Sequence, residues 1–357
     1  MTTEDIDRLA RKRANGRNVK RHLLACALAL VAAVAQAGMG TLELPGAAGD
    51  GPVTVFYPTA AAERALPMGP YTLHAAPGAP PQRGNGRLVV VSHGSGGGAI
   101  TYSDLAHRLV DAGFIVAAPE HRGDNWHDMA DAGPDSWKRR PGEASRAIDA
   151  LARDPRFAPL FDAGRVGFYG MSAGGHTALA VAGGRWSPSQ LLGHCEAHIH
   201  DDFPSCVGLA LQLRGDMFDG LKQKLALFVI RRKLGDPQWY SHDDPRFAAV
   251  VAEVPFAVDF DMQSLAAPRV PLGLVQARKD KWLAPQYHVG RVIAACKGCE
   301  VVADLPGAGH GSLLSPQPVG LPEPAAGLLA DPPGFDRAQV PQVHARIAAF
   351  FTRHLAP

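Results

Sequence analysis

Short apolar segments alternate with segments of helical apolar spacing from residue 53 to the end of this 357-residue chain. Such alternation is typical of a mostly parallel, doubly wound α/β sheet with helices on both faces. The expected strands span residues 53–57, 88–91, 114–118, 166–169, 248–254, 272–276 and 301–303. The expected helices lie within residues 105–110, 144–151, 173–182 and 343–354.

Residues 186–246 interrupt this alternation. They are rich in Pro, His and Cys and contain one helical stretch, at about residues 221–232. We interpret them as an insertion that forms a cap over the sheet. We expect residues 38–357 to form one domain, because α/β folds commonly reach this size as a single unit.

The first 37 residues have the organisation of a secretory signal peptide. Basic residues up to Arg21 precede an apolar run, residues 23–35, and Ala35-Gln36-Ala37 follows it as a small-residue cleavage site. An amphipathic anchor helix is the alternative, but the run is apolar on every face and is too short to span a bilayer. We predict cleavage after Ala37 and export to the periplasm or the medium. No apolar stretch long enough for a transmembrane helix is present.

The charge of the predicted mature chain argues against nucleic-acid binding. Seven of the 36 Lys and Arg residues and three of the 34 Asp and Glu residues lie in residues 1–37. The remainder has 29 basic and 31 acidic residues, so it lacks the excess of cations that binds a phosphate backbone.

Four cysteines remain after the predicted cleavage: Cys195, Cys206, Cys296 and Cys299. An even number in an exported protein favours disulfides, and proximity in the sequence pairs the first two and the last two. A zinc site is the alternative, because three histidines lie near Cys195 and the last pair forms a CxxC: His194, His198 and His200. It is less favoured, since such sites need a second matched ligand pair.

The motif Gly170-Met171-Ser172-Ala173-Gly174 lies between an expected strand and an expected helix. This context is typical of a nucleophile elbow, where a sharp turn requires small neighbours and exposes the serine hydroxyl. A serine hydroxyl needs a histidine base oriented by a carboxylate, and in this fold the order along the chain is Ser, acid, His.

Asp280 and His310 follow two later strands in that order. His310 lies in a glycine-rich loop that we expect to be flexible. We therefore predict a triad of Ser172, Asp280 and His310. The other candidate acids are Glu253, Asp259, Asp261 and, less favoured, Asp304. His176 lies on the helix after the elbow and is interpreted as a core residue.

Two backbone amides are candidates for an oxyanion hole. The first is that of Ala173, directly after the predicted nucleophile. The second is that of Ser95 in the loop His93-Gly94-Ser95-Gly96-Gly97-Gly98. A phosphate-binding loop is excluded, because the Lys-Ser/Thr of a P-loop and the spaced G-x-G-x-x-G are both absent.

The sequence resembles the α/β-hydrolases of the dienelactone-hydrolase-like group that includes the platelet-activating-factor acetylhydrolases. The matching stretches are 90–97 (VVSHGSGG), 117–123 (AAPEHRG), 167–175 (GFYGMSAGG), 244–247 (DPRF) and 307–310 (GAGH). The resemblance implies an α/β-hydrolase fold and a Ser-Asp-His carboxylic-ester hydrolase without a metal or organic cofactor. Dienelactone hydrolases carry cysteine where this chain has Ser172, which favours small-molecule or lipid oxygen esters, such as short acyl groups on phospholipids.

These observations predict an exported serine esterase that acts through a covalent acyl-enzyme. A lipase, polyesterase or amidase on the same fold is an alternative within the enzymes. A non-catalytic α/β-hydrolase that only binds its ligand is the alternative from another class.

Overall fold

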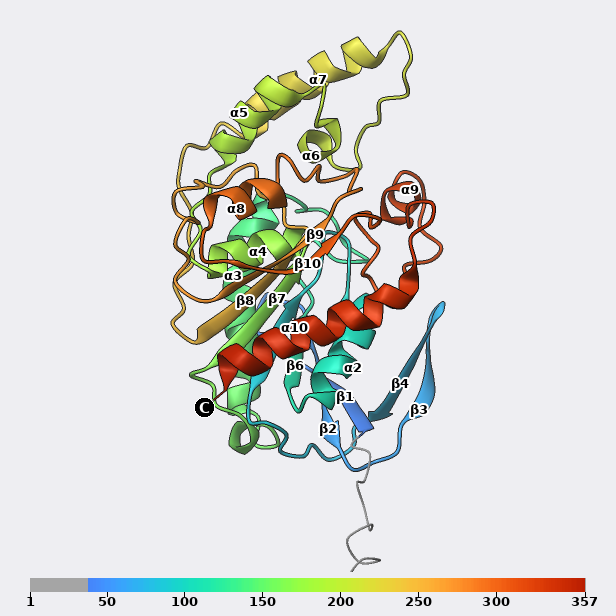
Figure 1. Ribbon diagram of the computed structural model, residues 1–357, viewed down its shortest axis with the longest axis vertical. Helices are drawn as coiled ribbons and strands as arrows, with labels where there is room; N and C mark the ends of the chain where they lie inside the picture. The colour runs from blue at the N-terminus through green and yellow to red at the C-terminus, as the bar shows by residue number, and fades with distance from the viewer. Residues whose placement is uncertain (1–37, 357) are drawn as a thin grey trace, which may run out of the picture. The chain divides into compact units, whose positions relative to one another are not determined.

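The computed structural model describes residues 38–356 (Figure 1). The predicted signal peptide and its cleavage site at Ala37 lie outside the described residues. A ten-stranded sheet has the order β10-β9-β8-β7-β5-β6-β2-β1-β4-β3. The six strands from β10 to β6 pair in parallel, whereas β2 pairs antiparallel with both β6 and β1. The predicted mostly parallel α/β sheet is therefore confirmed.

The strands are β1 (Gly38–Leu44), β2 (Val53–Thr59), β3 (Arg64–Met68), β4 (Tyr71–Pro77), β5 (Leu88–Ser92), β6 (Ile115–Pro119), β7 (Val166–Met171), β8 (Phe247–Glu253), β9 (Leu272–Ala277) and β10 (Glu300–Leu305). The seven expected strands correspond to β2 and to β5 through β10. The first strand and the β3–β4 hairpin were not predicted. Every residue of β3 is exposed or half-buried, so the hairpin lacks the continuous apolar run that marks the central strands.

The helices are α2 (Ser103–Asp111), α3 (Pro134–Arg153), α4 (Ala173–Val181), α5 (Pro188–His198), α6 (Phe203–Val207), α7 (Asp219–Lys233), α8 (Val289–Ala295), α9 (Ala325–Leu329) and α10 (Val340–Leu355). Short 3₁₀ helices span Ala99–Tyr102, Ala158–Leu160 and Arg337–Gln339. None of the helices that the structure describes is long and apolar enough to cross a membrane.

Helices cover both faces of the sheet, and the central strand β5 shows why its residues are all apolar. Leu88 and Val90 pack into the core beneath α3, α4 and α8. Val89 and Val91 point to the opposite face and pack beneath α2 and α10. Because successive side chains of a strand point to opposite faces, a strand with helices on both sides needs apolar residues at every position.

The segment predicted to form a cap, which we continue to call the cap, begins and ends at neighbouring points of the structure. Trp186 and Tyr240 exchange two backbone hydrogen bonds, of 3.0 and 2.8 Å, and the chain between them forms α5, α6 and α7. These helices lie at one end of the molecule, apart from the sheet (Figure 1). The helix expected at about residues 221–232 is α7, whereas α5 and α6 were not predicted.

Both disulfides expected from sequence proximity are present. Cys195 and Cys206 join α5 to α6, with their Cα atoms 5.7 Å apart. Cys296 and Cys299 join the end of α8 to the start of β10, with a Cα separation of 5.6 Å. The sulfurs that the alternative zinc site would need are thus bonded to each other.

Candidate active site

The G-x-S-x-G motif forms a strained turn between β7 and α4. Ser172 has φ 57° and ψ −115°, a backbone conformation that few residues other than glycine adopt. A Cβ atom added at Gly170 would lie 2.0 Å from the carbonyl oxygen of Gly174. One added at Gly174 would lie 2.0 Å from that of Ser92. The two glycines are therefore required by backbone packing, and they leave the Ser172 side chain at the carboxyl end of the sheet.

The three predicted triad residues lie together. The Nε2 atom of His310 is 3.0 Å from the Ser172 hydroxyl oxygen, and its Nδ1 atom is 2.6 Å from the Asp280 carboxylate. With the proton on Nδ1 donated to Asp280, Nε2 is left to accept the serine hydroxyl. The side chains of His310 and Asp280 are buried, whereas Ser172 is half-buried and accessible to a ligand.

Backbone groups fix the carboxylate of Asp280. Its second oxygen accepts hydrogen bonds of 2.8 Å from the amides of Trp282 and Leu283. The indole ring of Trp282 also packs against the imidazole of His310, with ring centroids 5.2 Å apart. One oxygen of the Asp280 carboxylate is thus hydrogen-bonded to backbone amides, and the other is hydrogen-bonded to His310.

The loop that carries His310 is packed, contrary to the flexibility expected from its glycines. A Cβ atom added at Gly311 would lie 2.4 Å from the carbonyl oxygen of Leu329, and one added at Gly309 would lie 3.0 Å from Pro332. The glycines allow residues 329–332 to approach closely, and this contact holds the imidazole in place.

Two of the other candidate acids are buried and paired elsewhere. Glu253 accepts a 2.8 Å hydrogen bond from the Tyr169 hydroxyl, and its burial raises its pKa to about 7. Asp259 accepts a 3.0 Å hydrogen bond from Nε2 of His176 in the core. His176 is therefore a core residue, as the sequence indicated.

The remaining two candidate acids form exposed ion pairs. Arg185 lies 2.6 Å from Asp261, and Arg278 lies 2.5 Å from Asp304. Asp280 is the only one of the five candidates that is bonded to His310 within residues 38–356.

The glycine-rich loop after β5 lies directly beside Ser172. A Cβ atom added at Gly94 would be 3.4 Å from that of Ser172. The amides of Gly94, Gly96 and Gly97 donate to the Tyr102 hydroxyl, the Asp124 carboxylate and the Gly94 carbonyl.

Two amides near Ser172 remain free of backbone acceptors. The Ser95 amide has no acceptor among the described residues, and Ala173 begins α4, where no intrahelical acceptor exists for its amide. Both amides named from the sequence thus lack an acceptor within residues 38–356.

A buried ion pair that the sequence did not reveal supports this loop. Asp124 accepts hydrogen bonds from the Ser95 hydroxyl at 2.5 Å and the Gly96 amide at 3.2 Å. Arg140 donates to the same carboxylate at 2.8 Å and to the His93 carbonyl at 2.6 Å. Burial alone would raise the pKa of Asp124, but Arg140 and the Ser95 hydroxyl hold it below its ordinary value.

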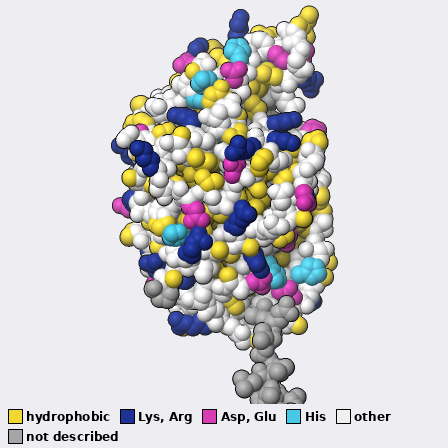
Figure 2. Space-filling view, in the orientation of Figure 1, with side chains coloured by type: hydrophobic (Ala, Val, Ile, Leu, Met, Phe, Trp, Pro, Cys, Tyr) yellow, Lys and Arg dark blue, Asp and Glu magenta, His cyan; other side chains and the backbone are white. Residues whose placement is uncertain are grey.

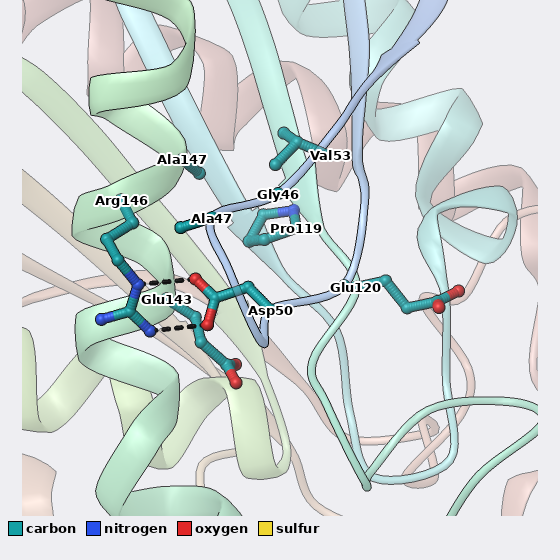
Figure 3. A pocket seen from close by; sticks show the side chains of 10 residues that line it. Gly46, Ala47, Asp50, Val53, Pro119, Glu120, Glu143, Arg146 and Ala147 are labelled. Carbon is teal, nitrogen blue, oxygen red and sulfur yellow. Dashed lines mark hydrogen bonds and ion pairs between the residues drawn. The ribbon is translucent and has the colours of Figure 1, made fainter.

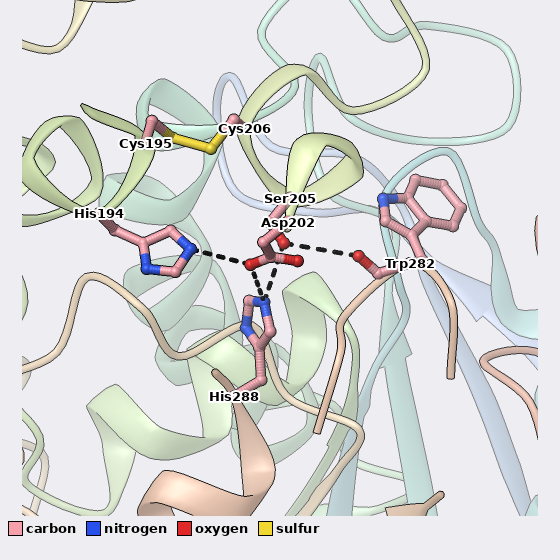
Figure 4. The surroundings of a disulfide bond; sticks show 7 residues. All are labelled: His194, Cys195, Asp202, Ser205, Cys206, Trp282 and His288. Atoms are coloured by element: carbon pink, nitrogen blue, oxygen red, sulfur yellow. Dashed lines mark hydrogen bonds and ion pairs between the residues drawn. A yellow bond between two sulfur atoms is a disulfide. The ribbon is translucent and has the colours of Figure 1, made fainter. Parts of the chain in front are cut away.

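A cluster of buried polar side chains links the cap to the loop of Asp280 (Figure 4). Nε2 of His194, on α5, lies 2.8 Å from the Asp202 carboxylate. The Ser205 hydroxyl contacts Nε2 of His288 at 3.0 Å and the Trp282 carbonyl at 3.5 Å. Burial would raise the pKa of Asp202, but His194 and His288 lower it overall. The cap is thus attached to the loop of Asp280 by polar contacts, while the Cys195–Cys206 disulfide joins α5 to α6 within the cap.

A small cavity elsewhere does not overlap this site. It is lined by Asp50, Glu143, Arg146 and neighbouring residues, and Arg146 forms two hydrogen bonds to Asp50 (Figure 3). Its volume of about 10 Å³ has room for one water molecule. None of the predicted site residues lines it, so we do not assign a substrate to it.

Comparisons with known proteins agree with this architecture. Residues 68–128 match the family of platelet-activating factor acetylhydrolase, isoform II. That segment contains the glycine-rich loop and Asp124, and it ends before Ser172. The solved structure of a ferulic acid esterase from Streptomyces cinnamoneus is similar, with 21% identity, 91% of each chain covered and a TM-score of 0.55. No curated protein matches the sequence significantly.

Proposed function

We propose that this chain is an α/β-hydrolase of the platelet-activating-factor-acetylhydrolase-like group and an exported serine carboxylic-ester hydrolase. The observation that carries the proposal is the hydrogen-bonded series from Ser172 through His310 to Asp280, with the serine on a strained elbow. Two disulfides support export, because such bonds persist in oxidising compartments.

The proposed reaction has two steps. The Ser172 oxygen attacks the ester carbonyl while Nε2 of His310 takes the hydroxyl proton, and that proton then passes to the departing alcohol. The acyl group remains on Ser172 as an ester. Water then attacks it, giving one proton to His310, which returns it to Ser172 as the free acid leaves. Asp280 stabilises the imidazolium in both steps and stays ionised.

The amides of Ser95 and Ala173 are the proposed donors to the negatively charged oxygen of each tetrahedral intermediate. Such donors act most strongly when they are already oriented in the free protein. The contacts of Asp124 with the Ser95 hydroxyl and the Gly96 amide support that orientation. The proposed substrates are esters of small molecules or lipids. Apart from the ester and water, the steps above involve only side chains and amides of the chain.

Substitution of the triad tests this proposal with p-nitrophenyl esters from acetate to palmitate. Ser172→Ala should lower kcat by about 10⁶, and Asp280→Asn should lower it by about 10⁴. Ser189→Ala and Asp304→Asn are matched controls, because both residues lie outside the triad and should leave kcat unchanged. If Ser172→Ala kept more than about a tenth of the activity, Ser172 would not be the nucleophile.

A further inference from the structure

Helix α7 of the cap presents apolar side chains to solvent instead of to the protein. Its buried residues, Gln223, Ala226 and Ile230, form the face that packs inward. Leu221, Leu225 and Phe228 follow one another at helical spacing on the opposite face and are 65%, 57% and 51% exposed. This outward face is the reverse of the pattern expected for a helix on the surface of a water-soluble domain.

The turn before α7 extends the same apolar face. Met217 and Phe218 are both exposed. The Asp219 carboxylate accepts hydrogen bonds from the amides of Arg214 and Gly215, which fixes the turn that carries these two side chains. We call the five residues the outward apolar face: Met217, Phe218, Leu221, Leu225 and Phe228.

The same helix is strongly cationic. It contains five basic residues and one acid, Asp219, a net charge of +4, whereas residues 38–357 together have 29 basic and 31 acidic residues. Lys222 pairs with Asp219, and Arg231 pairs with Glu196.

The remaining cations of α7 form no ion pair with other described residues: Lys224, Arg232 and Lys233. The guanidinium group of Arg232 lies 3.9 Å from the centre of the Phe228 ring, on the outward apolar face itself. Hydrophobic and basic side chains occur together at the end of the molecule that carries α7 (Figure 2).

We propose that the outward apolar face and the cations around it are a docking surface for a membrane containing anionic phospholipids. Leucine and phenylalanine side chains enter the boundary between headgroups and acyl chains, while lysine and arginine reach the phosphates. A second copy of the chain is the less favoured occupant, because two α7 helices of charge +4 would repel each other.

Docking in this way would bring the candidate active site to the membrane. The cap contacts the loop of Asp280 through Ser205 and Trp282, and α5 and α7 are joined by the Glu196–Arg231 ion pair. The proposal does not depend on the proposed chemistry, because binding is measured without a substrate.

Vesicle co-sedimentation tests the proposal, with every variant prepared in the same form so that any contribution of residues 1–37 is common to all. The wild-type protein should bind vesicles of phosphatidylcholine mixed with phosphatidylglycerol more tightly than vesicles of phosphatidylcholine alone. Leu225→Gln combined with Phe228→Gln should weaken binding to the mixed vesicles by about tenfold or more. Lys224→Gln combined with Arg232→Gln should have a similar effect on the mixed vesicles and little effect on the neutral ones.

Met68→Gln combined with Val319→Gln is the matched control, since both side chains are about half exposed and lie outside the cap. This control should bind as the wild type does. Equal binding of all variants would overturn the proposal, as would equal binding to both kinds of vesicle. A dimer that forms without vesicles and is lost in the Leu225 and Phe228 variant would also overturn it, because the face would then contact a second copy. Unfolding temperatures equal to that of the wild type exclude misfolding as the cause.

Discussion

Replacing Asp124 with asparagine tests how the proposed oxyanion loop is held. Both Asp124 and Arg140 are fully buried, and their charged atoms lie 2.8 Å apart. One carboxylate oxygen faces Arg140, and the other faces the Ser95 hydroxyl and the Gly96 amide. All of these neighbours act as donors here, so either orientation of an asparagine amide would place a donor against a donor.

Asp124→Asn should lower the free energy of unfolding substantially, because it leaves the buried guanidinium of Arg140 without a counter-charge. Removing one partner of a buried ion pair destabilises proteins by about 3–5 kcal/mol. Glu300→Gln is the control, because Glu300 and Arg353 form a pair whose side chains are 43% and 52% exposed. Losing that pair should cost less than about 1 kcal/mol.

Urea unfolding at several pH values measures both effects. The pKa of Asp124 is lowered in the folded protein, so its contribution is complete well above the ordinary value of 3.8 and declines as the pH falls below it. Asp124→Asn should therefore be most destabilising at neutral pH and should approach the wild type in acid.

The kinetics of Asp124→Asn provide a second measurement. Without the contacts of Asp124 with the Ser95 hydroxyl and the Gly96 amide, the loop no longer holds the Ser95 amide in its orientation. The kcat should therefore fall by about tenfold or more even where the variant is fully folded. A cost at pH 7 as small as that of Glu300→Gln, together with an unchanged kcat, would refute the role of the ion pair.

Two further perturbations probe the core and the cap. Burial raises the pKa of Glu253 to about 7 from 4.5, so the folded protein loses stability as the pH rises through this interval. Glu253→Gln should therefore gain about 3 kcal/mol relative to the wild type between pH 4.5 and 7, and a pH-independent difference in urea unfolding would contradict this. Replacing Cys195 and Cys206 with serine should cost about 3 kcal/mol and impair hydrolysis of long-chain esters more than of acetate. The Cys296–Cys299 disulfide closes a shorter loop, so replacing both of its cysteines with serine should cost about 2 kcal/mol without changing chain-length preference. Equal ester profiles for the two double variants would exclude a role of the first disulfide in the cap.

The central sheet could be predicted because its strands are buried on both faces. β5 through β9 have nearly continuous apolar runs, and the helices between them have clear apolar spacing. β1, β3 and β4 could not be recognised in the same way. They lie on the far side of β2 in the sheet, and β3 has no buried residue, so no apolar run separates them from loops.

The residues of the proposed triad could be named from the sequence because the fold fixes the order of such residues along the chain and their position after strands. The support of the loop beside Ser172 was not identified, because Asp124 and Arg140 belong to a loop and a helix whose contact depends on tertiary packing. A fully buried arginine at residue 140 has no distinguishing feature in the sequence. The flexibility expected for the His310 loop was wrong, since its glycines serve close packing against residues 329–332.

Mass spectrometry after reaction with a fluorophosphonate tests the central claim most directly. The reagent forms a stable bond with an activated serine oxygen, with loss of fluoride, and needs no knowledge of the natural ester. We predict one adduct per chain, on the peptide containing Ser172, absent from Ser172→Ala and much slower to form in Asp280→Asn. An adduct on another residue, or an unlabelled protein that still hydrolyses p-nitrophenyl acetate, would contradict the proposed role of Ser172.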